Sequence, residues 1–456
     1  MIEVSQPSEA VQAMRQDWAL VRALLGGTRA MREAGTKYLP KWPNEQAADY
    51  QVRLNSAVLF PAFKRTVATL ASKPFSKPLT YGDDVPAPIR ELCEDVDLHG
   101  RNLHVFAHDV FRAALGYGMA GILVDYPRTD GVRTLEDERR IGARPYMVAI
   151  GCEQLLGWRA SRVAGRWRVD MLRFVETVSE PDGEFGERRV EQIRVLVPGA
   201  WRTYRQADAG WVAHEEGVTT LPYVPFVPVY GEREGFMLGK SPLIEVAHMN
   251  VQHWQDSSDQ QKSVRFARVR IAAIVGGDPD QQVTIGADYF LRLPPDASIQ
   301  IAQGSAESVD IGRKEIDALE EQMRQAGAEL LVMRPGQITA TQTATENAVG
   351  MSVLQSMAEG MEDALDAALQ IMADWTGQPQ GGHVSLYKDF GAATLAEASA
   401  QIVLGASTAG LISKRTAIEE LKRRGTLGPN VDPDTERELI DAQGPALGAI
   451  TDADSQ

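Results

Sequence analysis

The sequence ENAVGMSVLQSMAEGMEDALDAALQIMADWT, residues Glu346–Thr376, predicts one long amphipathic helix. Its larger apolar side chains recur at steps of three or four, which places them on one helical face: Leu354, Met357, Met361, Leu365, Ala368 and Met372. The stretch contains six acidic residues and no lysine or arginine. Just upstream, Thr343 and Glu346 have the spacing of a capping box, whose side chains satisfy backbone N–H groups at a helix start. We therefore expect the helix to begin at Glu346.

A polar segment separates this helix from an earlier one. It has the sequence MRPGQITATQT (Met333–Thr343), in which a Pro-Gly pair and small polar residues indicate a loop. The earlier pattern, Ile311–Met333, also spaces its apolar residues by three and four. This order of helix, polar loop and long acidic helix is typical of a protein with a mechanical role rather than of an enzyme.

Composition excludes some classes of protein. With 456 residues, of which 44% are hydrophobic and 24% charged, the chain can form about two to four ordinary folded units. The formal net charge is −15, whereas proteins that bind nucleic acid through its phosphates normally present a basic face. This charge disfavours a sequence-specific nucleic-acid binder, but it is compatible with a conduit through which DNA slides.

Neither the cysteines nor the N-terminus indicates a disulfide framework, a zinc site or export. Cys93 and Cys152 are the only cysteines, and they lack C-x-x-C spacing. The N-terminal sequence has early acids and no apolar run. No stretch of about 18 apolar residues exists to span a bilayer. We expect a protein that is cytosolic when made and has no membrane partner.

The first half of the chain begins with helical patterns. Residues 8–35 and Glu45–Ser72 are both helical in spacing, and Pro61 must bend or split the second pattern. A further helix is predicted at Leu103–Leu115, and a short buried strand follows it at Gly121–Pro127.

Strands then dominate residues 145–230, where alternating segments are separated by Pro-Asp-Gly and Pro-Gly turns. A helix returns at Ser241–Phe266, and its second half is polar on nearly all sides, so it must contact polar partners or solvent. A short mixed segment, Val269–Ala302, precedes the Ile311–Met333 helix. The C-terminal part carries short helices such as Ser413–Gly425 and a tail that we expect to be disordered.

Motifs of enzymes and metal sites occur only in incomplete form. Gly116–Gly121 matches G-x-G-x-x-G, but a helix precedes it and a strand follows, which reverses the order of a dinucleotide site. Gly235–Ser241 is similar to the end of a phosphate-binding loop but has too few residues between its glycines. His104 and His108 lie one helical turn apart, with no third ligand suggested nearby. We expect no catalytic residue, no metal and no cofactor.

One basic cluster stands out in this acidic protein. Lys262, Arg265, Arg268 and Arg270 place four cations within nine residues. Two interpretations stay open: a solvated face, or a docking surface for an acidic partner or for DNA.

Three stretches, in this order, resemble the portal proteins of tailed bacteriophages, in particular the portal-like group. They are Lys37–Pro78, Asp97–Pro127 and Thr343–Gly377, and the resemblance extends over most of the chain. It implies an α+β portal fold with a helix and sheet wing, a two-helix stem, a small α/β clip, a tunnel loop before a long kinked helix, and a short helical crown. It also implies a homo-oligomeric ring, usually a dodecamer, at one capsid vertex.

Order and length relate the parts of such a subunit to this chain. The wing corresponds to residues 1–240, with a helical N-terminal part and a β-rich part at 145–230. Stem helices at 241–266 and 311–333, with a clip at about 267–305, together make up residues 241–333. The remaining parts are a tunnel loop at 334–345, the long helix and its return to the wing at 346–392, and the crown and disordered tail at 393–456.

The resemblance also implies roles for three sets of residues. The tunnel loop comprises Arg334, Pro335, Gly336, Gln337, Ile338, Thr339, Ala340, Thr341 and Gln342. The channel-facing acids are Glu359, Asp363 and Asp366, which would keep DNA phosphates from adhering. Arg265, Arg268 and Arg270 are the residues expected to dock partners at the clip.

The function implied is a structural connector without enzymatic activity, through which viral DNA is packaged and ejected. Its expected partners are double-stranded DNA, bound without sequence specificity, the large terminase that acts as packaging motor, a head–tail adaptor, and capsid or scaffold proteins. The expected location is the virion, and the host cytoplasm during assembly. The alternatives are another phage structural protein, such as a head–tail adaptor or minor capsid component, and a nucleotide- or metal-dependent enzyme.

Overall fold

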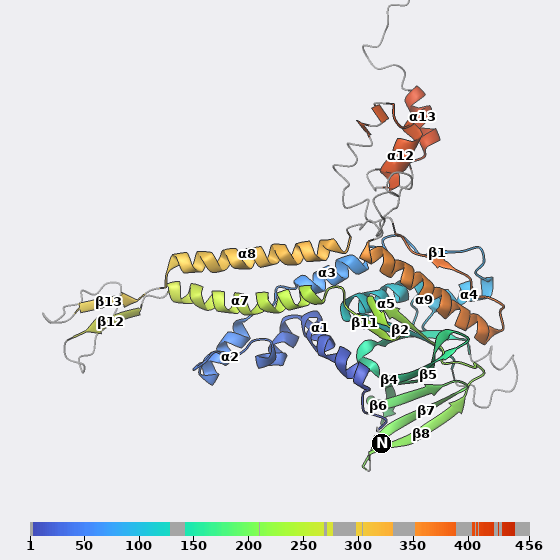
Figure 1. Cartoon of the computed structure of the whole chain (residues 1–456), viewed down its shortest axis with the longest axis horizontal. Coiled ribbons are helices and arrows are strands. Elements are labelled where there is room, and N and C mark those ends of the chain that lie inside the picture. Colours follow the sequence, from blue (N-terminus) through green and yellow to red (C-terminus); the bar gives the residue numbers. More distant parts are fainter. Residues whose placement is uncertain are drawn as a thin grey trace, which may run out of the picture.

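The computed structural model describes residues 3–127, 142–208, 210–268, 271–276, 298–302, 304–331, 352–388 and, apart from 406, 409, 424–426 and 428–430, residues 404–442. Helices and strands are mixed, which confirms the predicted α+β class. Figure 1 shows a body of helices and sheets from which two long helices project as an arm. No described helix is long and apolar enough to cross a membrane.

The N-terminal third is helical, with the break that the sequence predicts. Its longer helices are α1 (Glu9–Ala34), α2 (Ala47–Ser56), α3 (Ala62–Ala71) and α5 (Leu103–Tyr117). Pro61 lies directly before α3 and separates it from α2, because proline cannot continue a helix from its interior. The short elements between them are the 3-10 turns Gly35–Lys37 and Cys93–Asp95, and α4 (Ala87–Leu92).

A three-stranded antiparallel sheet of order β3-β2-β9 lies in the body. Its central strand is β2 (Met119–Asp125), flanked by β3 (Tyr146–Gly151) and β9 (Phe226–Tyr230). All residues of β2 except the last are buried, which explains the continuous apolar run in its sequence. Helix α5 contacts β2 and β9, as does the later helix α9 (Val353–Thr376), so both helices cover this sheet.

The remaining strands confirm the predicted β-rich segment. A five-stranded antiparallel meander follows the 3-10 turn Cys152–Gln154 and consists of β4 (Leu155–Val163), β5 (Arg166–Asp182), β6 (Gly186–Val197), β7 (Ala200–Ala207) and β8 (Gly210–Val218). Two small pairs join β10 (Glu232–Gly235) to β11 (Leu238–Lys240), and β1 (Thr80–Tyr81) to β14 (Val384–Ser385). Gly183 and Gly199 occupy the predicted turns with positive φ.

The arm consists of α7 (Ile244–Arg268) and α8 (Ala306–Glu329), which lie side by side along their length (Figure 1). At its free end, β12 (Ile271–Val275) pairs with β13 (Ser298–Ala302) as antiparallel strands. Helix α8 begins five residues before the predicted Ile311, because the Ser305 side chain caps it by accepting the Ser308 N–H.

The long acidic helix starts later than the sequence predicts. Ser352 has an extended backbone (φ −76°, ψ 158°) and forms a capping box with Gln355, so α9 begins at Val353 and the predicted start at Glu346 is wrong. The expected capping residues Thr343 and Glu346 lie outside the described residues. Beyond α9, the described C-terminal helices are α12 (Lys414–Arg423) and α13 (Pro433–Ala442).

Candidate functional site

Helix α7 is anchored in the body by polar side chains. The fully buried Asn250 accepts a hydrogen bond from the Phe63 N–H (3.0 Å) and donates one to the Phe60 carbonyl (2.8 Å). Gln255 donates to the Tyr38 carbonyl (2.9 Å). These contacts explain how a helix that is polar on nearly all sides can pack, because its polar groups satisfy backbone groups of the body.

Polar contacts also join the two helices of the arm. His253 Nε2 lies 3.1 Å from Glu320 Oε1, and Gln260 donates to the Val309 carbonyl (2.6 Å). A Cβ at Gly312 would lie 2.2 Å from the Gln260 side-chain oxygen, so the two helices approach each other closely here. The arm is therefore a packed pair of helices with specific hydrogen bonds between them.

A buried ion pair ties α2 to the loop before it and to α7. The Arg53 side chain, 7% exposed, donates to both carboxylate oxygens of Glu45 (2.9 and 2.8 Å) and to the Pro40 carbonyl (2.7 Å). Its Nη1 also lies 3.8 Å from Asp259 Oδ1 on α7. The hydrogen bond from Arg53 lowers the pKa of Glu45, whereas burial raises the pKa of Asp259.

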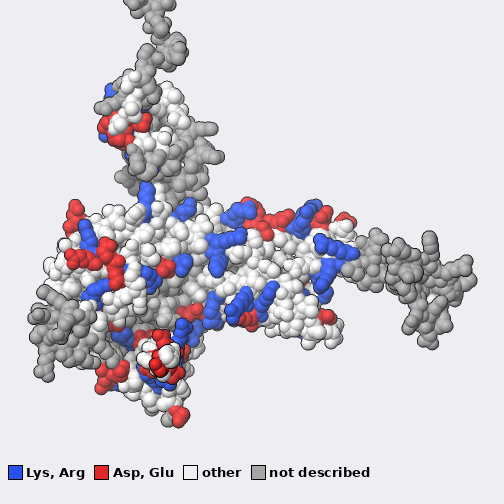
Figure 2. All heavy atoms as spheres, turned by 180° about the vertical axis from the view of Figure 1, so that it is seen from behind, with Lys and Arg blue, Asp and Glu red and all other residues white. Residues whose placement is uncertain are grey.

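The cations expected to dock partners lie at the free end of α7. Arg265 and Arg268 are exposed, and the described part of the chain gives neither an ion-pair nor a hydrogen-bond partner. Lys262 differs, because its Nζ lies 3.8 Å from the ring centre of Trp42. Arg270 lies outside the described residues. Figure 2 shows basic side chains along the visible face of the arm up to that end, where they also interact favourably with the helix dipole.

Two of the acids expected to face a channel instead contact the chain that follows α9. Asp366 accepts a hydrogen bond from the Val384 N–H (2.8 Å), and burial raises the pKa of its carboxyl. The Glu359 carboxylate lies 3.9 Å from Nζ of Lys388, which forms a closer ion pair with Glu362 (2.8 Å). Residues 384–388 therefore lie along this side of the helix, and the channel-facing role expected of the three acids stays a prediction.

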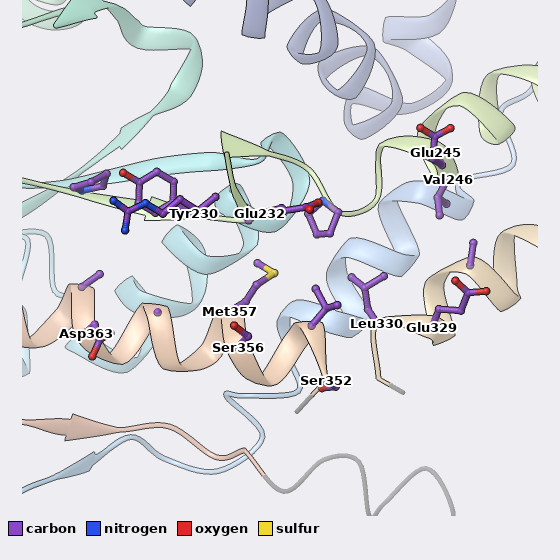
Figure 3. Close-up of a pocket in the computed structure, with 18 of the residues that line it drawn as sticks. Tyr230, Glu232, Glu245, Val246, Glu329, Leu330, Ser352, Ser356, Met357 and Asp363 are labelled. Carbon is purple, nitrogen blue, oxygen red and sulfur yellow. The ribbon is translucent and has the colours of Figure 1, made fainter. Parts of the chain in front are cut away.

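Asp363 lies instead on the rim of a groove at the root of the arm (Figure 3). The groove, of about 1030 Å³, is formed by the start of α7, the end of α8, the start of α9, and β9 with the β10–β11 hairpin. Its floor includes the buried side chains of Val246, Leu330 and Met357. Asp363 itself is exposed and has no ion-pair or hydrogen-bond partner within the described ranges.

The predicted tunnel loop, Arg334–Gln342, lies outside the described residues. The two segments that flank it come together at the groove, where the Leu354 N–H donates to the Leu330 carbonyl (3.2 Å). The end of α8 and the start of α9 are thereby held together at the root of the arm.

The two glycine-rich motifs that are similar to nucleotide-binding sequences have structural roles. Gly118 ends α5 with a φ of 92°, and a Cβ there would lie 2.4 Å from the carbonyl carbon of Lys240. Ser241, at the end of the second glycine motif, donates to the Leu115 carbonyl (2.8 Å) and accepts the Leu243 N–H (3.2 Å). Both motifs thus hold α5 against the segment that leads into α7.

The paired histidines pack against an aromatic ring. His104 accepts the Leu79 N–H (3.2 Å), His108 lies 3.4 Å from the Ser72 hydroxyl, and both rings meet Phe75 edge-on. Burial lowers the pKa of His108. Among the described residues, no group of three or more His, Cys, Asp and Glu side chains could hold a metal ion.

The sequence analysis missed a buried charge network between the two larger sheets. Arg194 on β6 donates to both carboxylate oxygens of Asp125 at the end of β2 (2.6 and 3.0 Å), and Tyr146 donates to the same carboxylate (3.2 Å). This network fixes the meander against the sheet that α9 covers. No sequence signal marks these residues, because polar residues are usual at strand ends and in alternating strands.

Comparisons with known proteins give one family match and several distant structural likenesses. A family model described as a domain of unknown function (DUF4055) matches residues 242–376, which include the arm and α9 but less than half of the chain. No curated protein matches the sequence.

Solved structures similar to this chain include chains of gene transfer agent (GTA) particles. A chain from the virion of a native particle is 12% identical, with a TM-score of 0.39, and the match covers 80% of this chain and 89% of that one. A chain from the neck of an empty particle, computed with C6 symmetry, is 14% identical, with a TM-score of 0.39 and coverages of 80% and 90%. Likenesses at this level define neither the fold nor the function of this chain.

Proposed function

We propose that this chain is the subunit of a portal ring, the connector at one vertex of a phage capsid, and has no catalytic activity of its own. One observation carries the proposal: two paired helices project from an α+β body, end at the antiparallel strand pair β12–β13, and are followed at their root by a long helix across the central sheet. This order of elements is the one expected from the wing, stem, clip and long helix that the sequence resemblance implies.

Under this proposal the arm is the stem and the β12–β13 pair belongs to the clip. Residues 1–240 form most of the wing, and the chain after residue 392 forms the crown and tail. Twelve subunits form the ring, and the contacts of Asn250 and Arg53 hold each stem rigidly to its wing. The connector then resides in the virion and docks the large terminase, a head–tail adaptor and capsid or scaffold proteins.

DNA would be driven through the ring by the separate, ATP-using terminase. Residues 334–345 would line the narrowest part of the channel. Acids near the path keep phosphates from adhering, since every favourable contact has to be broken at each step.

Particle mass tests the proposal. Twelve chains of 49.9 kDa sum to about 0.6 MDa, and light scattering on the purified protein should give a mass near this value. A stable mass of 49.9 kDa at all concentrations would contradict it. If rings form but immunolabelling places the protein in the tail-side neck only after packaging is complete, the head–tail adaptor alternative is favoured.

A further inference from the structure

The rim of the groove at the root of the arm is acidic and unpaired. Four exposed carboxylates line it, from four different elements: Glu232, Glu245, Glu329 and Asp363. None of them has a hydrogen-bond or ion-pair partner in the described ranges. The arginine on this rim, Arg233, lies over the ring of Tyr230 (5.1 Å) instead of against a carboxylate.

Apolar side chains form the floor between these acids. Val246, Leu330, Met357 and Ala364 line the groove, and each is less than 10% exposed. A volume of about 1030 Å³ is large enough for several side chains of a partner. The groove can therefore bind a partner surface whose short side chains pack on the apolar floor and whose unpaired lysines or arginines pair with the carboxylates of the rim.

Such a surface exists elsewhere on the same chain. From Tyr50 to Gly82 the sequence contains five lysines and arginines and no acid, in a protein of net charge −15. Helix α3 lies within this stretch, and its exposed face consists of Lys64, Arg65, Ala68 and Thr69. Neither cation has a carboxylate partner among the described residues, and Arg65 lies over the Phe60 ring.

The groove and α3 contact different sides of the C-terminal part of α8. A Cβ at Gly327 would lie 2.8 Å from the Thr66 side chain, so this side of α8 touches α3. Ala326, Glu329 and Leu330, on another side of α8, line the groove. In Figure 3, which looks into the groove, α3 passes behind the groove residues.

We propose that the acidic groove of one subunit receives the basic face of α3 from a second copy of this chain. Complementary surfaces on two different sides of one chain form a heterologous, head-to-tail contact, which closes into a ring when the rotation allows it. The proposal rests on the proposed function in that the ring supplies the second copy. Because its cations and acids are exposed, the contact should weaken as salt rises.

A charge swap tests this contact in the full-length protein. The groove variant carries Glu329→Lys and Asp363→Lys, and the α3 variant carries Lys64→Glu and Arg65→Glu. Each variant alone should raise the concentration needed for half-maximal assembly by about tenfold or more, because like charges then face one another. The combination of all four substitutions should restore assembly to near the parental concentration.

The matched control is Glu307→Lys with Asp317→Lys, two exposed acids of α8 that do not line the groove. It changes the net charge by the same amount as the groove variant and should assemble as the parent does. Circular dichroism and thermal melting confirm that each variant is folded.

The outcomes separate this inference from the proposed function. If the parent forms rings and the groove variant assembles equally well, or the combined variant assembles no better than either pair alone, the groove contact is overturned and the ring proposal stands. If the parent never assembles, the proposed function fails. If the α3 variant loses only DNA retention and assembles normally, the α3 face is a DNA surface and this inference is wrong.

Discussion

Asn250 of the arm and Phe63 of the body are joined by a buried hydrogen bond of 3.0 Å, in which the Asn250 side-chain oxygen accepts the backbone N–H in the first turn of α3. The same amide donates to the Phe60 carbonyl (2.8 Å). One side chain of α7 thus completes the start of a helix 187 residues earlier in the sequence. The angle between arm and body depends on such contacts.

Replacing Asn250 should destabilise the fold strongly. The substitution Asn250→Ala leaves the buried N–H of Phe63 without a partner, which costs about 1–3 kcal/mol. The Phe60 carbonyl loses one hydrogen bond but keeps the one from the Ala62 N–H (2.9 Å). Thermal and urea unfolding of the purified protein measure this loss. The control is Gln252→Ala, an exposed position on the same helix, which should change little. Equal effects of the two substitutions would show that Asn250 does not anchor the arm.

Substitutions of Asp366 should separate the effect of its buried charge on stability from the effect of its hydrogen bond to the Val384 N–H. Burial raises the pKa of this carboxyl above its ordinary 3.8, so the folded state loses stability as the pH rises through 3.8 and then through the raised value. At pH 7, Asp366→Asn removes the charge and keeps an oxygen that accepts the Val384 N–H, so the melting temperature should rise. Asp366→Ala removes the acceptor, and the melting temperature should fall.

The advantage of Asp366→Asn over the parent should shrink as the pH falls toward 3.8, where the parental carboxyl is also neutral. Asp317→Asn, at an exposed carboxylate of α8 that does not line the groove and has no described partner, is the control and should leave the melting temperature nearly unchanged. A melting temperature lowered equally by Asn and Ala at position 366 would contradict this account.

Local sequence signals predicted the elements well where a single rule dominates. Pro61 splits α2 from α3, and the apolar run of β2 is a buried central strand, because proline geometry and burial act locally. The start of α9 was missed because the sequence contains two capping-box patterns whose cap residues, Thr343 and Ser352, are nine positions apart, and Ser352 caps α9. Local spacing does not tell which box starts the helix.

The contacts of the α9 acids could not be predicted, for a different reason. A rotation of about 100° per residue predicts that Glu359, Asp363 and Asp366 share one side of the helix. It does not predict which other segment covers that side, and residues 384–388 contact two of the three acids. The groove that Asp363 lines is assembled from segments far apart in sequence, so no local pattern could reveal it.

Reversal of the basic cluster should weaken docking of partners. The triple variant Arg265→Glu, Arg268→Glu and Arg270→Glu should bind terminase or adaptor at least about tenfold more weakly, because electrostatic attraction becomes repulsion. Parental binding should weaken as salt rises. Titration by fluorescence anisotropy at two salt concentrations measures both effects.

The control for this experiment reverses three exposed cations of α8, Arg313, Lys314 and Arg324, and gives the same change in net charge. It should bind the partners as the parent does. Unchanged binding by the Arg265, Arg268 and Arg270 variant would show that this cluster is a solvated face and not a docking surface.

Deletion of Gly336–Thr341 should separate assembly from DNA handling. If this segment lines the narrowest part of the channel, rings should form with unchanged mass, while DNA packaging or retention is impaired. The control deletes six residues of the C-terminal tail, Ala449–Asp454, and should package normally. A Gly336–Thr341 deletion that packages and retains DNA like the parent would refute the channel assignment.

The central claim is that this chain is a ring-forming connector, and electron microscopy of the purified full-length protein tests it most directly. The account predicts ring-shaped particles of about twelve subunits with a central hole, and with the α7–α8 arms surrounding that hole. Single compact particles at every concentration, or assemblies without an axial opening, would contradict it.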